Sequence, residues 1–202
     1  TMHKAQYFSH NGKRKKSDSD QMSHDKSIIG EHNIYRSMAG TIASRLLDLR
    51  KENIRQCLSD FRNSGHRLEH VASVRGVSFI NDSMATNVNA TWFALETTGN
   101  PLIWIAGGHD TGNDYSPLFE LVYKKVKGMV FIGNNNRQII RAFQHTGIPY
   151  VEAGSAMEAV DAAFAMSTPG DTVLLSPACA SFDKYESFEE RGEHFKKAVY
   201  DL

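Results

Sequence analysis

Three clusters of small and polar residues contain most of the side chains in this sequence that could hold a small ligand. They are residues 81–87 (NDSMATN), 107–114 (GGHDTGND) and 177–183 (PACASFD). Hydroxyl and amide groups bind carboxylates and phosphates, above all at the N-terminus of a helix, where the first amides lack partners. In the first cluster we therefore expect Ser83 and Thr86 to supply hydroxyls to an anion.

A structural role is the alternative for this first cluster. Asp82 or Ser83 could cap a helix, and Thr86 or Asn87 could open the helix that follows, because such residues often fill these positions. The sequence leaves both interpretations open.

The second and third clusters each contain one residue that could perform catalysis. His109 could act as a general base, although a loop histidine without an identified partner more often has no such role. Cys179 could act as a nucleophile, but no paired histidine is evident, and the role of a small buried hydrophobic residue is favoured. Gly107 and Gly108 would let the backbone approach a ligand closely, and Ser181 is expected to face that ligand.

Short apolar runs alternate with segments of helical period from residue 66 onward, which indicates an α/β fold. The expected strands are VSFIND, PLIWIAGG, GMVFIG, IPYVEAG and DTVLLSP. The expected helices span residues 88–97, 117–125, 137–145, 156–166 and 188–200. Since strands as apolar as LIWIAG must be covered on both faces, we predict a Rossmann-like, mostly parallel, doubly wound sheet. Ligands bind such sheets at the carboxyl ends of the strands, where all three clusters lie.

The first 65 residues have a different character. Residues 1–29 are polar and charged after a strand-like start, so we expect a flexible segment. Its basic cluster, residues 13–16, could contact phosphate, but acidic residues follow directly and a solvated loop is favoured. Residues 34–49 and 54–61 have helical periodicity. The sequence therefore divides into a polar segment (1–29), a helical segment (30–65) and the α/β domain (66–202).

Charge and composition exclude several classes of function. Lys plus Arg and Asp plus Glu each number 23, so the net charge is zero and nothing favours nucleic acid or an anionic membrane. The two cysteines, Cys57 and Cys179, lie far apart and form no metal-binding motif. No apolar run approaches the roughly 20 residues of a membrane helix. We expect a cytoplasmic protein that binds no nucleic acid, no membrane and no metal through its own residues. A monomer is expected, although the sequence leaves the oligomeric state open.

Five motifs, in order and spacing, resemble one family of enzymes. FINDSMATNVNATWFAL, IAGGHDTGNDYSPL and LLSPACASFDKYESFEERGEHF resemble the C-terminal signatures of the MurD-type Mur ligases. Residues 30–33 (GEHN) resemble the G-x-H-N at the end of that family's central ATP-binding domain, and residues 66–69 (HRLE) resemble its H-R-x-E at the domain boundary. The resemblance implies that residues 66–202 form a glutamate-binding domain, preceded by a remnant of the central domain.

This resemblance implies an ATP-dependent ligase of peptidoglycan synthesis, which joins D-glutamate to UDP-N-acetylmuramoyl-L-alanine. In the family, ATP with magnesium converts the substrate carboxylate to an acyl phosphate, which the amine of glutamate attacks. Thr86 and Ser181 would hold the carboxylates of glutamate, and Phe188 would lie beside it. His109 and Thr111 would belong to the same site.

The resemblance also implies contacts to the nucleotide. Arg67 would lie near phosphate and Asp82 near ribose, while Asn33 and Arg36 would lie near the adenine. Arg36 departs from the family, which has a second asparagine there. The sequence contains no G-x-x-x-x-G-K-[ST] loop for the ATP phosphates, so this chain alone is expected to be inactive. It would be either a fragment of a longer ligase or a truncated homologue.

Two further departures remove positive charge from the implied glutamate site. Met84 stands where the family has the lysine of D-S-K-A-T-N, and Thr111 stands where a lysine usually follows the Gly-Gly turn. A charge-assisted hydrogen bond contributes roughly 1.5 to 3 kcal/mol, so the loss of both lysines would weaken recognition by about a hundredfold or more.

Three functions can therefore be compared. The first is the glutamate-binding part of a Mur ligase. The second is a non-catalytic relic that retains the fold and a weak ligand site, which Met84 and Thr111 favour. The third is a Rossmann oxidoreductase, which the alternating pattern allows but the absence of G-x-G-x-x-G after the first strand disfavours.

Overall fold

The structure of this chain is a computed structural model that describes residues 65–99 and 101–202. The chain divides into two units, residues 1–62 and residues 63–202, and every described residue belongs to the second. The expected polar segment and the expected helices before residue 65 lie outside the described residues. Cys57 and the implied nucleotide contacts Asn33 and Arg36 also lie outside them.

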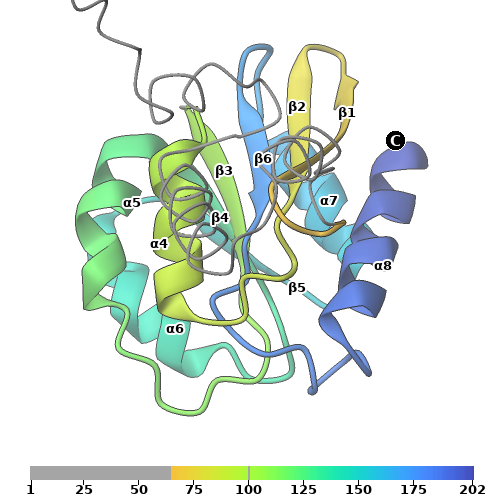
Figure 1. Cartoon of the computed structure of the whole chain (residues 1–202). Helices are drawn as coiled ribbons and strands as arrows, with labels where there is room; N and C mark the ends of the chain where they lie inside the picture. The colour runs from red at the N-terminus through yellow and green to blue at the C-terminus, as the bar shows by residue number, and fades with distance from the viewer. Residues whose placement is uncertain (1–64, 100) are drawn as a thin grey trace, which may run out of the picture. The chain divides into compact units, whose positions relative to one another are not determined.

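The described unit contains a six-stranded sheet in the order β1-β2-β6-β3-β4-β5 (Figure 1). The strands are β1 Glu69–Val74, β2 Val77–Asn81, β3 Leu102–Ala106, β4 Val126–Ile132, β5 Tyr150–Ala153 and β6 Thr172–Leu175. Only the β1–β2 pair is antiparallel, and the four other pairings are parallel. The prediction of a mostly parallel sheet is therefore confirmed.

Strand β1 was not expected from the sequence. It forms a hairpin with β2 through Arg75 and Gly76, both of which have positive φ angles of 49° and 83°. Its side chains are half-buried or exposed throughout, so it lacks the apolar run that marked the other strands.

Helices cover both faces of the sheet (Figure 1). They are α4 Val88–Thr97, α5 Phe119–Lys125, α6 Arg137–Phe143, α7 Ala156–Ala165 and α8 Phe188–Tyr200, with short 3-10 turns at Ser116–Leu118 and Gln144–Thr146. Trp104 packs in the core formed with α4, α5 and α6, whereas Ile103 and Ile105 pack in the core formed with α7 and α8. This alternation explains why every residue of β3 is buried and confirms the doubly wound arrangement.

The helices agree with the sequence in position and differ at their ends. The segment expected to begin at Pro117 starts with the 3-10 turn, and the segment expected to reach His145 leaves the α-helix after Phe143. The following 3-10 turn ends at Gly147, whose φ of 72° is left-handed. These short turns share the local spacing of an α-helix, so periodicity alone cannot separate them.

Candidate functional site

The three polar clusters meet at the carboxyl ends of the strands. Backbone bonds join them: Gly107 N–H donates to Pro177 O at 2.9 Å, His109 N–H donates to Ala180 O at 2.8 Å, and the loop after β2 joins through Ala178 N–H to Ala85 O at 3.0 Å. The loops that follow β2, β3 and β6 therefore form one connected surface, as the sequence predicted.

Two glycines make this close approach possible. Gly107 and Gly108 have φ angles of 106° and 133°, a conformation that residues with a side chain rarely adopt. A Cβ atom on Gly107 would lie 2.5 Å from Ile132 O, and one on Gly108 would collide with Ala180 O. The Gly-Gly turn is thus required for packing between loops, in addition to any approach to a ligand.

The hydroxyls of Thr86 and Ser181 have no hydrogen-bond partner among the described residues. Ser181 is only 2% exposed. Its carbonyl accepts from Lys184 N–H at 3.2 Å and Tyr185 N–H at 3.0 Å, so the backbone that carries the hydroxyl is fixed. Both side chains belong to the connected loops, where the sequence-based interpretation required them.

Ser83, by contrast, does not offer its hydroxyl to an anion, and that prediction was wrong. Ser83 is fully buried. Its Oγ donates to Phe188 O at 2.7 Å and accepts from Arg191 Nε at 2.9 Å. Ser83 does not cap the next helix either, because Asn87 Oδ1 accepts from Ala90 N–H at 2.9 Å. Of the alternatives that the sequence left open, the cap at Asn87 is the one observed.

Arg191 connects two of the loops from below, and the sequence-based analysis missed it. It is 2% exposed, and its guanidinium also donates to Ser83 O at 2.8 Å and Cys179 O at 3.1 Å. Burial lowers the pKa of Arg191 to about 10, which still leaves it positively charged at neutral pH. One signal could have revealed it: Arg191 falls within the apolar stripe of α8, together with Phe195 and Ala198.

Phe188 begins α8 beside His66. The two rings meet edge to face, with centroids 6.3 Å apart. His66 has a left-handed φ of 65°, and its carbonyl accepts from Met84 N–H at 3.0 Å. Close packing continues at Gly192, where a Cβ atom would collide with the His66 ring. The half-buried Phe188 and Met84 therefore lie next to one boundary residue of the domain.

Asp82 is a buried carboxylate at the end of β2. It is 5% exposed, and its oxygens accept from Leu68 N–H at 3.2 Å and Ser176 Oγ at 2.9 Å. Burial raises its pKa to about 7, although these hydrogen bonds and the nearby Arg67 oppose the shift. Arg67 and Asp82 thus lie close enough to interact electrostatically.

His109, Thr111 and Cys179 differ sharply in exposure. The side chains of His109 and Thr111 are exposed, and among the described residues no hydrogen bond orients the imidazole as a general base would require. Cys179 is buried, its Sγ lies 3.2 Å from Tyr115 Oη, and burial raises the pKa of its thiol to about 11. A thiol that stays protonated is a poor nucleophile, so the interpretation of Cys179 as a small buried residue is confirmed.

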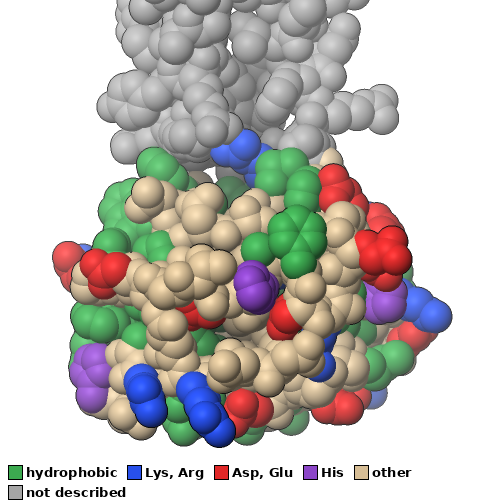
Figure 2. Space-filling model, turned by 90° about the horizontal axis from the view of Figure 1, so that it is seen from below, with side chains coloured by type: hydrophobic (Ala, Val, Ile, Leu, Met, Phe, Trp, Pro, Cys, Tyr) green, Lys and Arg blue, Asp and Glu red, His purple; other side chains and the backbone are tan. Residues whose placement is uncertain are grey.

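The face formed by these loops has no concentration of positive charge. Figure 2 shows that backbone and uncharged polar atoms occupy most of it, with a histidine near the centre and Lys and Arg side chains toward the margins. In the part of the chain that the structure describes, no group of three or more His, Cys, Asp or Glu residues could hold a metal ion. Likewise, none of the described helices is long and apolar enough to cross a membrane.

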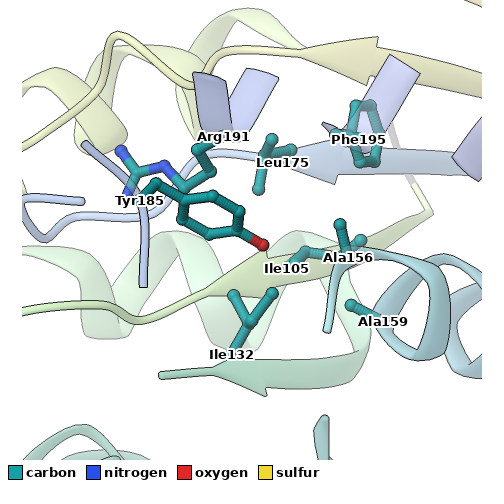
Figure 3. A pocket seen from close by; sticks show the side chains of 8 residues that line it. All are labelled: Ile105, Ile132, Ala156, Ala159, Leu175, Tyr185, Arg191 and Phe195. Atoms are coloured by element: carbon teal, nitrogen blue, oxygen red, sulfur yellow. The ribbon is translucent and has the colours of Figure 1, made fainter. Parts of the chain in front are cut away.

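A small pocket lies beneath the loops, on the side of the sheet covered by α7 and α8. Tyr185 and Arg191 reach it, with the Tyr185 hydroxyl directed toward Ala156 (Figure 3). The other lining side chains are apolar: Ile105, Ile132, Ala156, Ala159, Leu175 and Phe195. This lining does not suit a charged amino acid, and the pocket belongs to the packing beneath the site.

Comparison with known proteins identifies the domain. Residues 66–179 match the family model described as "Mur ligase, glutamate ligase domain". The chain is 48% identical over 176 residues to the UDP-N-acetylmuramoylalanine--D-glutamate ligase of Bacteroides fragilis. The matched segment covers 87% of this chain and 40% of that protein. It is 47% identical over 175 residues to the corresponding ligase of Porphyromonas gingivalis, covering 87% of this chain and 39% of that protein. The chain thus spans about two fifths of the length of these relatives.

Solved structures share the fold at low sequence identity. The UDP-N-acetylmuramate-alanine ligase MurC of Thermotoga maritima has a TM-score of 0.61 at 14% identity, covering 85% of this chain and 38% of that one. Folylpolyglutamate synthase of Mycobacterium tuberculosis, solved with ADP and AMPPCP, has a TM-score of 0.60 at 15% identity, covering 87% and 40%. These two structures show the fold alone. The matched glutamate ligase domain, together with the two curated relatives, shows that the chain belongs to the Mur ligase family.

Proposed function

We propose that this chain is the amino-acid-binding part of an ATP-dependent ligase that adds D-glutamate to UDP-N-acetylmuramoyl-L-alanine in peptidoglycan synthesis. In the proposed reaction, the γ-phosphate of ATP is transferred to the alanine carboxylate, which gives an acyl phosphate and ADP. The amine of the amino acid attacks the acyl carbon, loses a proton and displaces phosphate. The observation that carries the proposal is the convergence of three loops around the uncommitted hydroxyls of Thr86 and Ser181.

The proposed site residues in the described part of the chain form two groups, one for the amino acid and one for the nucleotide. Thr86 and Ser181 would donate to the carboxylates of glutamate, and the half-buried ring of Phe188 would pack beside its aliphatic chain. His109 and Thr111 extend from the neighbouring loop toward the same face. Arg191 contributes positive charge from below, and three of its N–H groups are bonded to Ser83 and Cys179.

Arg67 and Asp82 are the proposed nucleotide contacts in the described part of the chain. Arg67 would face phosphate as a bidentate donor. Asn33 and Arg36, also proposed for the nucleotide, lie outside the described residues. A magnesium ion does not fit the described residues, because they contain no cluster of acidic ligands and both oxygens of Asp82 accept bonds from the protein. We therefore assign the phosphate-binding loop and the metal to other parts of the ligase and derive no step through them.

The boundaries of the domains are part of the same proposal. Residues 66–202 would be the glutamate-binding domain, residues 30–65 the helical end of a central ATP-binding domain, and residues 1–29 a polar segment. A cytoplasmic location and a monomeric state complete the proposal.

Titration of the chain with D-glutamate, observed by NMR, tests the proposed site. We expect tens of millimolar D-glutamate to shift the amide signals of Thr86, His109 and Ser181. The signals of Gly76 and Gly170, in turns at the opposite ends of the strands, serve as the internal control. Equal shifts at both ends, or none near Ser181, would contradict the assignment.

A second function has one observation in its favour. Met84 and Thr111 replace the two lysines of the family pattern, which fits a relic that retains the fold and performs no chemistry. The upstream reading frame separates the two: an intact phosphate-binding loop in frame supports the ligase, and a frame without one supports the relic.

A further inference from the structure

The loop after β3 is fixed from within by a buried phenol. Tyr115 is 2% exposed, and its Oη donates to Asp110 Oδ2 at 2.6 Å. The other oxygen, Asp110 Oδ1, accepts from the N–H groups of Gly112 and Asn113 at 2.9 and 3.0 Å. A single carboxylate thus sets the shape of the turn that carries Thr111.

The same turn is also attached to its neighbours. Asn113 Nδ2 donates to Ala178 O at 3.1 Å, and Gln138 Nε2 donates to Asn113 O at 3.1 Å. The Tyr115 hydroxyl also lies 3.2 Å from Cys179 Sγ in the loop after β6. The turn therefore has a defined position relative to the loop after β6, which carries the Ser181 hydroxyl.

The phenol is suited to act as a permanent donor. Burial, together with the adjacent Cys179 and Asp110, raises the pKa of Tyr115 above its usual value. Its hydroxyl consequently stays protonated at neutral pH and keeps its proton for the bond to Asp110.

We infer that Tyr115 is a positioning residue of the amino-acid site, because its bond to Asp110 places residue 111 in register with the loop after β6. The inference rests on the proposed function in one respect, namely that residue 111 faces the amino acid. It predicts that any ligand group introduced at position 111 depends on the Tyr115 hydroxyl.

The loop after β2 provides a matched control. Met84 N–H donates to His66 O, and the adjacent Ser83 accepts from Arg191. Neither bond involves Tyr115 or Asp110. A lysine at position 84 should therefore bind glutamate independently of the phenol, whereas a lysine at position 111 should not.

The experiment is a double-mutant cycle on the 202-residue chain. D-Glutamate affinity is measured by NMR titration for Thr111→Lys and for Met84→Lys, each with and without Tyr115→Phe. We expect Tyr115→Phe to weaken binding by about fivefold to tenfold in the Thr111→Lys background and by less than about twofold in the Met84→Lys background. Tyr123→Phe, which removes an exposed hydroxyl, should change neither affinity.

Amide hydrogen exchange gives a second readout that needs no ligand. In Tyr115→Phe, exchange at Gly112 and Asn113 should accelerate about tenfold while amides of β3 keep their rates. If this variant does not fold, Asp110→Ala removes the same restraint and should give the same pattern.

Three results would overturn the inference. Unchanged exchange at Gly112 and Asn113 would overturn the positioning role alone. Equal loss of affinity in both lysine backgrounds would show a general effect on folding instead. If neither lysine improves binding, the proposed amino-acid site itself fails, even where exchange responds, and the role assigned to Tyr115 fails with it.

Discussion

Two sets of polar groups in and beneath the three loops differ in how completely they are bonded. Arg191, Ser83 and Asp82, the bonded set, are buried, and each is hydrogen-bonded to the protein. Thr86 and Ser181, the unbonded set, have hydroxyls without a partner among the described residues, although Ser181 is only 2% exposed. In the proposed site, the bonded set fixes the shape of the loops and the unbonded set would meet the ligand.

The comparison predicts its largest effect at Arg191. Arg191→Ala leaves the buried acceptors on Ser83 and Cys179 without a donor, so the free energy of unfolding should fall by about 3 kcal/mol or more. Urea unfolding of both proteins measures this loss. Arg141→Ala, which removes an exposed arginine from α6, should change the free energy by less than about 0.5 kcal/mol. Equal effects of the two substitutions would mean that Arg191 is not structural.

The next largest effect is expected at the Gly-Gly turn. Gly108→Ala places a side chain at a φ of 133° and against Ala180 O, so we expect a loss of about 2 kcal/mol or more. Gly99→Ala is the control, since a Cβ atom there would meet nothing within 4 Å. Thermal unfolding compares them. A Gly108→Ala protein as stable as the control would show that the loops need no such close approach.

Asp82 makes the free energy of unfolding of the domain depend on pH. Burial raises its pKa from an ordinary value of 3.8 to about 7 in the folded chain, so the folded state binds the proton more tightly. The stabilisation that comes from the proton on Asp82 is fully present below pH 3.8 and is lost as the pH rises through 7. The free energy of unfolding should fall by roughly 2 to 4 kcal/mol over this range. Asp82→Asn should remove the decline and stabilise the domain at pH 8. An unchanged pH profile of the free energy of unfolding would refute this explanation.

The smallest effects on stability are expected at Thr86 and Ser181, whose hydroxyls have no partner among the described residues. Thr86→Ala and Ser181→Ala should each change the free energy of unfolding by less than about 0.5 kcal/mol, because no protein bond is lost. Each should weaken D-glutamate binding by about twofold to tenfold. Ser83→Ala is the matched control, with a loss of about 1 to 3 kcal/mol in stability. Large destabilisation by Ser181→Ala would erase the distinction between the two sets.

Sequence periodicity predicted the parallel strands and the helices because their burial follows local patterns of apolar residues. Strand β1 escaped prediction because its residues alternate between half-buried and exposed positions with no apolar run. Its only strong local signal is the turn at Arg75 and Gly76. Short edge elements of this kind depend on pairing with a neighbour, which local sequence does not specify.

The site was predictable in position and less so in detail. The three clusters could be placed because parallel strands bring their carboxyl ends together. The role of Ser83 could not, since its partner Arg191 lies 108 positions further along the chain. A serine in a loop looks the same in the sequence whether its hydroxyl is buried under a helix or open to a ligand. Only tertiary contacts distinguish Ser83 from Thr86.

The central proposal is that the site lacks two positive charges, at positions 84 and 111, that would meet the two carboxylates of D-glutamate, while the buried groups beneath it remain hydrogen-bonded. Calorimetric titration with D-glutamate, at low and high ionic strength, tests this most directly. The unmodified chain should bind D-glutamate with a Kd no tighter than the millimolar range, which is a standard binding free energy of about −4 kcal/mol. Met84→Lys with Thr111→Lys should tighten binding at least tenfold, with a smaller gain at high salt because of screening. Micromolar binding by the unmodified chain, or no gain in the double variant, would contradict the account.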